Sequence, residues 1–178
     1  ERKQMKQTTK KVVTIVGGGS TAHALVPFLS GSGHVVNLLT RRPLEWSKNV
    51  LLQQHSINGE IQAEYSGSLA RISNLAKNVI PQADIIMLCM PVSKYRIALN
   101  NIGPFVNKKR IVYLGTIYGQ GGFNWMVEDI MRKYKLNNLI YFAVGLVPWI
   151  CRIAEYGRIG ITYGSKYRNV VAISSPDH

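Results

Sequence analysis

A short apolar run that ends in three consecutive glycines and restarts as a helix constrains the fold of this chain more than any other feature. The segment reads VVTIVGGGSTAHAL over residues 12–25. Its β-branched start has no polar alternation, which is typical of a strand buried on both faces of a parallel sheet. A helix is predicted after the glycines, with Ser20 as its N-cap and Pro27 as the site of a kink.

Strand-like and helix-like segments alternate along the rest of the 178-residue chain. Such alternation predicts βαβ units with right-handed crossovers. We therefore predict an α/β fold, a Rossmann-type doubly wound, mainly parallel sheet with helices on both faces. Strands are predicted at 34–40, 83–91, 109–116, 138–146 and 169–174, helices at 43–55, 74–80, 93–106 and 123–135, and hairpins around Asn58-Gly59 and over 152–166.

Length and composition indicate a single Rossmann domain at 11–178. It is preceded by a polar tail at 1–10 that we expect to be disordered or tag-like. The chain has no apolar stretch of about 18 residues and no signal-peptide core, so we expect a cytoplasmic protein without contact to a membrane. Two cysteines and four histidines lie scattered without metal-ligand spacing, so we predict no metal site.

The formal net charge of +13 raises the question of nucleic-acid binding. The basic residues stand in short groups, TRRP, NKKR and MRKYK, besides those of the tail. No helix carries a continuous basic stripe, and no basic run is interleaved with aromatic residues for base stacking. We therefore expect no nucleic-acid partner, and expect the charge to attract anionic cofactors and substrates.

The glycine turn has the pattern of a dinucleotide-binding site. In the pattern Gly17-x-Gly19-x-x-Ala22, the first glycine permits the tight turn and the second lets a pyrophosphate approach the backbone. Ala22 allows the helix to pack closely on the strand, and the helix N-terminus offers free N–H groups to phosphate. The alternative is a tight turn without a ligand. The predicted cofactor-binding residues here are Gly17, Gly18, Gly19, Ser20, Thr21 and Ala22.

The end of the second strand bears on which dinucleotide is bound. An acidic residue about 20 positions after the glycines holds the ribose 2′-hydroxyl of NAD, and no acid stands there. Thr40, Arg41 and Arg42 stand there, and a hydroxyl with two guanidinium groups suits a 2′-phosphate. We therefore favour NADP(H) over NAD(H), the alternative being a solvated loop. Cys89 and Pro91, at the end of the strand at 83–91, are predicted to lie near the cofactor, with Cys89 buried rather than reactive.

Two later segments go beyond a generic dinucleotide-binding domain. GTIYGQGGFNWMVEDI at 115–130 and GLVPWICRIAEYGR at 145–158, together with GGGSTAHAL, resemble the octopine/opine dehydrogenase family from about residue 11 onwards. This resemblance implies an NAD(P)-dependent oxidoreductase acting on a CH–NH bond, which reductively condenses a 2-keto acid with an amino acid. It also implies a helical C-terminal domain with a His-Asp pair, absent from this sequence, so no catalytic residue is assigned here and the chain alone is expected to be inactive.

The resemblance also implies four substrate-binding residues. Gln120 matches a glutamine that faces the amino-acid substrate, with a loop-capping amide as the alternative. Cys151 matches a cysteine near the active site, either reactive beside Arg152 or simply packed. Trp149 is expected as a wall of the cleft or a core residue, and Arg152 as a partner of a substrate carboxylate or of Glu155.

Other functions fit parts of the sequence. A related two-domain dehydrogenase, of the glycerol-3-phosphate dehydrogenase or ketopantoate reductase type, shares the glycine turn, but PWICRIAEYG argues against it. A non-catalytic module that senses nucleotides is the alternative outside enzymes. The expected partners are a small-molecule keto acid and an amino acid, with a homodimer left open.

Overall fold

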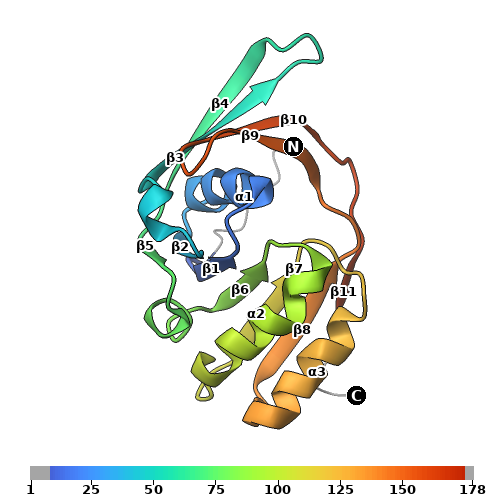
Figure 1. The fold of residues 1–178 in the computed structure, drawn as a ribbon. Helices are drawn as coiled ribbons and strands as arrows, with labels where there is room; N and C mark the ends of the chain where they lie inside the picture. The colour runs from blue at the N-terminus through green and yellow to red at the C-terminus, as the bar shows by residue number, and fades with distance from the viewer. Residues whose placement is uncertain (1–8, 175–178) are drawn as a thin grey trace.

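The structure, a computed structural model, describes residues 9–174 and is built around a seven-stranded sheet (Figure 1). Six neighbouring strands are parallel, and the seventh, β11, is antiparallel to β8. Their order across the sheet is β11-β8-β7-β6-β1-β2-β5. The strands are β1 (Val12–Val16), β2 (Val35–Leu39), β5 (Arg71–Ser73), β6 (Ile85–Leu88), β7 (Val112–Thr116), β8 (Leu139–Val144) and β11 (Val171–Ile173).

Outward from β1 the chain proceeds through β2 to β5 on one side, and through β6 and β7 to β8 on the other. This is the strand order of the Rossmann fold, whose ligand cleft lies where the direction of winding reverses. The predicted fold class is thus confirmed. The reversal falls between β1 and β6, at the carboxyl end of the strand that carries the glycines.

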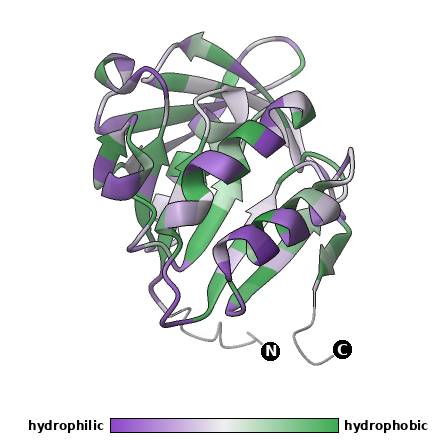
Figure 2. Cartoon of the chain, turned by 60° about the horizontal axis from the view of Figure 1, so that its bottom comes forward, coloured by the Kyte–Doolittle hydropathy of each residue, from purple (hydrophilic) through white to green (hydrophobic). Residues whose placement is uncertain are grey.

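Helices cover both faces of this sheet (Figure 1). Helix α1 (Ser20–Gly31) lies on one face, and α2 (Tyr95–Ile102) and α3 (Phe123–Tyr134) lie on the other. Helix α3 buries Phe123, Val127 and Ile130, spaced as one face of an amphipathic helix. Figure 2 shows mostly hydrophobic strands between layers whose outward surfaces are largely hydrophilic. Short 3-10 turns complete the fold: η1 (Pro43–Glu45), η2 (Ala76–Asn78), η3 (Val92–Lys94) and η4 (Gly103–Phe105).

A second sheet of four strands packs on the other side of α1, so that this helix is enclosed between two sheets (Figure 1). Helix α1 contains no charged residue, which agrees with a helix that is covered all round. Two strand glycines permit the close approach. A Cβ on Gly67 or Gly160 would collide with α1 at Pro27 or His23. The strands, in the order β4-β3-β10-β9, are β3 (Asn49–His55), β4 (Ile61–Ser68), β9 (Trp149–Glu155) and β10 (Ile159–Ser165).

Three local predictions were wrong. Residues 43–55, predicted as a helix, form only η1 and then β3, because β3 pairs with β4 through the Asn58-Gly59 hairpin and with β10. The helix predicted at 74–80 is reduced to η2. The N-cap of α1 is Gly19 rather than Ser20, and no side chain caps this end.

The remaining hairpin prediction was correct, since β9 and β10 form an antiparallel pair joined by a tight turn at Tyr156-Gly157. Helix α1 runs through Pro27 as one continuous element. The tail predicted at 1–10 lies mostly outside the described residues, which begin at residue 9.

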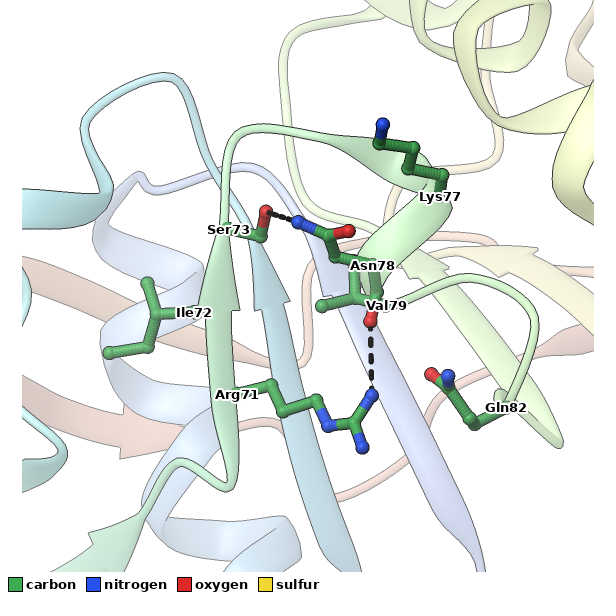
Figure 3. A pocket seen from close by; sticks show the side chains of 7 residues that line it. All are labelled: Arg71, Ile72, Ser73, Lys77, Asn78, Val79 and Gln82. Carbon is green, nitrogen blue, oxygen red and sulfur yellow. Dashed lines mark hydrogen bonds between the residues drawn. The ribbon is translucent and has the colours of Figure 1, made fainter.

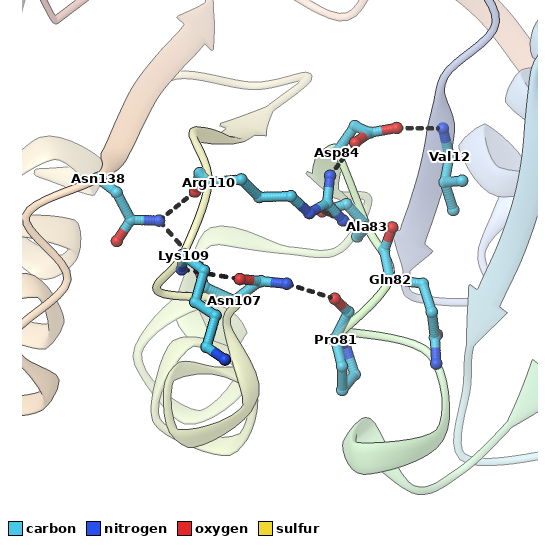
Figure 4. Close-up of polar contacts among 9 residues, drawn as sticks. All are labelled: Val12, Pro81, Gln82, Ala83, Asp84, Asn107, Lys109, Arg110 and Asn138. Atoms are coloured by element: carbon cyan, nitrogen blue, oxygen red, sulfur yellow. Dashed lines mark hydrogen bonds and ion pairs between the residues drawn. The ribbon is translucent and has the colours of Figure 1, made fainter.

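A polar network fastens the end of the sheet that lies opposite the glycines (Figure 4). The Asp84 carboxylate accepts the Val12 N–H at 2.8 Å and pairs with the Arg110 guanidinium. Arg110 also donates to the carbonyl oxygens of Gln82, at 2.6 Å, and Ala83, at 3.1 Å. One carboxylate thereby joins the first residue of β1 to the segments that precede β6 and β7.

We expect Asp84→Ala to lower the free energy of unfolding by about 2 kcal/mol, because it removes two hydrogen bonds to a partly buried carboxylate and leaves Arg110 without its partner. Urea unfolding followed by circular dichroism measures this change. Asp129→Ala is the matched control, since Asp129 pairs with Arg96 and Arg132 on an exposed surface, where ion pairs contribute little. Equal losses in the two variants would contradict the role given to Asp84.

Candidate functional site

The glycine turn follows β1 and lies between the ends of β2 and β6. The Gly17 N–H donates to the Leu39 carbonyl at 2.9 Å, and the Cys89 N–H donates to the Val16 carbonyl at 2.9 Å. Gly17 has a φ of +121°, and a Cβ at this position would overlap the carbonyl oxygen of Cys89. Only glycine satisfies both constraints.

The next two glycines differ in their surroundings. A Cβ on Gly18 would lie 2.7 Å from Thr40 Oγ1 and 2.8 Å from the Tyr156 hydroxyl, so this glycine is required by packing. Gly19 is exposed, and no atom lies within 4 Å of the place of its missing Cβ. Of the three glycines, Gly19 therefore leaves open space beside its backbone, as a bound pyrophosphate requires.

The N-terminus of α1 opens onto this space. Within residues 9–174, no backbone hydrogen bond occupies the N–H groups of Gly19, Ser20 or Thr21. The first turn carries no acidic residue that would compete for them. Unoccupied N–H groups and the positive end of the helix dipole form a site for an anion, so the residues present fit a dinucleotide phosphate.

Aromatic side chains wall the site where β2 ends. Trp46 is buried, and its indole N–H has no hydrogen-bond partner among the described residues. This N–H would lie 3.3 Å from a Cβ on Gly18. The Tyr156 ring, from the β9–β10 turn, lies 3.8 Å below the Arg42 guanidinium, which also pairs with Glu45 at 3.1 Å. The glycine turn thus has a rigid aromatic wall with an arginine on its rim.

Thr40, Arg41 and Arg42, the three predicted residues at the end of β2, differ in exposure. Thr40 is buried, and its hydroxyl accepts the Arg42 N–H at 3.4 Å. Arg41 is exposed and makes no ion pair or hydrogen bond within the described part of the chain. Thr40 lies beside Gly18, so the end of β2 adjoins the glycine turn.

Cys89 and Pro91 follow β6 on the other side of the turn. Cys89 is buried, and burial raises the pKa of its thiol far above the usual range, with the nearby Cys151 adding to the effect. Its carbonyl, rather than its thiol, contacts the glycine turn. Pro91 is exposed and precedes η3.

The structure places the four predicted substrate residues in two regions. Gln120 is exposed and lines a cavity of about 460 Å³ between the loop after β7 and strands β8 and β11. Trp149 packs on Phe28 of α1 with ring centroids 5.5 Å apart, and Cys151 Sγ lies 3.9 Å from Thr21 Oγ1. Arg152 points outward and donates to the carbonyl of Cys151 at 2.9 Å, while Glu155 pairs with Arg158 instead.

A second cavity of about 440 Å³ lies at the edge of the main sheet (Figure 3). Arg71 of β5 donates across it to the Asn78 carbonyl at 3.3 Å, and the Asn78 amide donates to the Ser73 hydroxyl at 3.1 Å. The cavity lies beside the short crossover that replaces a covering helix between β5 and β6.

Residues 9–174 contain neither a cluster of metal-ligating side chains nor a membrane-spanning helix. No group of three or more His, Cys, Asp or Glu side chains in this range is arranged to hold a metal ion. In the same range, no helix has the length and apolar character needed to span a membrane.

Sequence reasoning missed Trp46, Tyr156 and His23. The first two come from segments about 110 residues apart, and only the pairing of β3 with β10 unites them. The signal that could have indicated a second layer is the absence of charge in α1. A surface helix has a polar face, and this one has none.

No known protein-family profile matches the chain. Among curated proteins, it is 24% identical over 166 residues to an opine dehydrogenase of Haliotis discus hannai, covering 84% of this chain and 39% of the relative. It is 23% identical over 165 residues to an octopine dehydrogenase of Pecten maximus, covering 86% and 40%. The chain thus spans about 40% of the length of these relatives, and it resembles their N-terminal part.

Solved structures give the same fold. An octopine dehydrogenase bound to NADH and pyruvate matches with a TM-score of 0.81 and 22% identity, over 93% of this chain and 43% of that one. A yersinopine dehydrogenase bound to NADP+ matches with a TM-score of 0.76 and 16% identity, over 95% and 42%. A 2-dehydropantoate 2-reductase from Enterococcus faecalis reaches 0.61 and 18% identity, over 93% and 48%. The fold is that of Rossmann-type dehydrogenases.

Proposed function

We propose that this chain is the cofactor-binding domain of an NAD(P)H-dependent, opine-type dehydrogenase that reductively condenses a 2-keto acid with an amino acid. The observation that carries the proposal is the open space beside the Gly19 backbone. Gly19 is the N-cap of α1, whose N-terminus no side chain caps, and it follows β1, where the winding of the sheet reverses. The similarity to opine and octopine dehydrogenases supports this particular reaction over others of the same fold.

In this proposal the N–H groups of Gly19, Ser20 and Thr21 bind the pyrophosphate, and Gly17 and Gly18 keep the turn close to β2 and β6. Thr40 and the adjacent aromatic wall hold the adenosine ribose. When bound, the nicotinamide supplies the hydride that reduces the imine. The role of this domain is to hold that cofactor in position for a substrate bound beside it.

In this proposal the substrate side lies partly in this domain, and the catalytic groups lie in another one. We propose that Gln120, Trp149, Cys151 and Arg152 contribute to the substrate side, and that the acid/base pair lies in a helical C-terminal domain that follows residues 11–178. A keto acid and an amino acid are the proposed substrates, and the protein is proposed to act in the cytoplasm. A homodimer is compatible with this proposal.

The decisive experiment is turnover by the full-length gene product. NADPH oxidation is expected only when a keto acid, such as pyruvate, and an amino acid are both supplied. Oxidation with a keto acid alone would replace the proposal with a ketopantoate reductase-type reaction, whose fold also matches. Nucleotide binding without oxidation under any of these conditions would favour a sensing module.

We propose NADP(H) as the preferred cofactor, because Arg41 is exposed beside Thr40 and available to a 2′-phosphate. The double variant Arg41→Ala/Arg42→Ala is expected to weaken NADPH binding about tenfold to a hundredfold, from the loss of charge-assisted hydrogen bonds, with little change for NADH. Titration followed by tryptophan fluorescence measures both affinities.

Arg132→Ala, which removes an exposed arginine from α3 on the opposite face, is the control for net charge and should leave both affinities unchanged. An equal loss for NADH and NADPH in the double variant, or tighter binding of NADH by the unaltered chain, would contradict the preference for NADP(H).

A further inference from the structure

A single buried histidine connects the glycine turn to the tip of the β9–β10 hairpin. The Gly157 N–H donates to His23 Nε2 at 2.7 Å, so this nitrogen must present a lone pair. The proton of the neutral imidazole is therefore on Nδ1, which donates to the Gly19 carbonyl at 2.8 Å. His23 thus binds both segments, and only its neutral form makes both bonds.

The surroundings of His23 leave no freedom for another arrangement. The side chain is completely buried, with Trp46 and Tyr156 at ring-centroid distances of 4.3 and 5.5 Å. Gly160 of β10 lies so close that a Cβ there would approach His23 Cβ to 2.9 Å. The imidazole is held in one orientation, and its hydrogen bond with the Gly157 N–H is buried.

The hairpin tip packs closely against Glu45, in the segment after β2, and against the glycine turn. Gly157 has a φ of +73°, and a Cβ on it would overlap the backbone carbonyl of Glu45. The Tyr156 hydroxyl next to it covers Gly18. The tip is thus joined to the glycine turn at two points, at Gly18 through the Tyr156 hydroxyl and at the Gly19 carbonyl through His23.

We propose that His23 is a positioning residue that locks the Tyr156-Gly157 tip onto the glycine turn, and that protonation of His23 releases the tip and weakens dinucleotide binding. This inference rests on the proposed function for the identity of the ligand. Protonation would place an N–H at Nε2 directly against the N–H of Gly157, so a hydrogen bond becomes a repulsion between two donors.

The titratable side chain that packs against His23 is Tyr156 from the hairpin. Arg42 lies over the Tyr156 ring and pairs with Glu45, so these two charges face each other. Burial lowers the pKa of His23, with the hydrogen bond to Gly19 as a smaller opposing effect. The neutral form therefore persists at physiological pH, and the contribution to stability begins to fall below about pH 6.5, the value for an unfolded histidine.

The test uses NAD+ as the probe, because it has no 2′-phosphate to titrate. For the unaltered chain we expect the dissociation constant, measured by calorimetry, to rise at least about fivefold between about pH 8 and pH 5. His23→Gln presents an amide oxygen to Gly157 without a titrating group, so its dissociation constant should be nearly independent of pH. His23→Asn keeps only the bond to Gly19 and should bind about fivefold more weakly even at about pH 8.

A second measurement tests, without any nucleotide, whether His23 holds the hairpin tip (the latch). The backbone amide resonance of Gly157 should shift with the titration of His23 in the unaltered chain, and not in His23→Gln. NAD+ binding that is independent of pH in the unaltered chain, or equally pH-dependent in His23→Gln, would overturn the inference while leaving the proposed function intact. Absence of NAD+ and NADP+ binding at about pH 8 would overturn the proposed function instead, and the Gly157 resonance would then decide whether the latch exists.

Discussion

Gly17→Ala is expected to lower the free energy of unfolding by about 2–5 kcal/mol, the largest effect of any single substitution in the glycine turn. Two costs add at this position. Alanine is strained at a φ of +121°, and its Cβ would overlap the carbonyl of Cys89, a residue whose N–H donates to the Val16 carbonyl. A backbone atom cannot rotate away as a side chain does. Urea unfolding monitored by far-UV circular dichroism measures the loss.

Gly33→Ala separates these two costs. Gly33 has a φ of +86°, but no atom lies within 4 Å of its missing Cβ. The control should therefore show the conformational strain alone, about 1 kcal/mol. If Gly17→Ala lost no more than Gly33→Ala, the close approach of Gly17 to Cys89 would be refuted.

Gly19→Ala is expected to have the opposite effect: the free energy of unfolding changes little, but the affinity for the cofactor falls. Gly19 has a φ of −85° and open space at its missing Cβ, so alanine fits without strain, at a small cost as an N-cap. The methyl group would stand where the pyrophosphate must approach the backbone N–H groups. Losing about two such charge-assisted bonds corresponds to a roughly hundredfold weaker NADPH affinity.

Calorimetric titration with NADPH and a urea unfolding curve, run on the same preparation, test this separation. Gly31→Ala is the matched control, because Gly31 also has open space at its missing Cβ but lies at the opposite end of α1. It should bind NADPH like the unaltered chain. Unchanged NADPH affinity in Gly19→Ala would remove the main support for a pyrophosphate site.

The main sheet could be predicted from the sequence because each of its strands has a recognisable local pattern. VVTIV and IIML are apolar runs that can be buried only between two layers, and the glycines after β1 mark the reversal of winding. The amphipathic spacing of α3 was equally clear. Each of these features depends on residues within one short segment.

The second sheet was predicted only in part, because each of its two hairpins has a local signal but their pairing through β3 and β10 has none. The β3 residues NVLLQQH follow a proline and lack a strong strand pattern, so they were predicted as a helix. They become a strand because Leu52 lies beside Gly160 of β10 in a parallel pair, a contact between positions far apart in the chain. The residues of the candidate site likewise fall into those with a local sequence pattern and those without one. The glycines were found from their local pattern, whereas Trp46, Tyr156 and His23 assemble only in three dimensions.

The pairing of β3 with β10 also has a consequence for how the chain folds. Strands β1 and β2 pair with each other across the short segment that contains α1. In contrast, strand β3 begins at Asn49, and its second neighbour, β10, begins only at Ile159. Closing so long a loop is slow, because its entropy is lost before the contacts form. We expect the glycine turn to form early and the hairpin tip to dock late, so that during synthesis the proposed nucleotide site is completed only after β10 has left the ribosome.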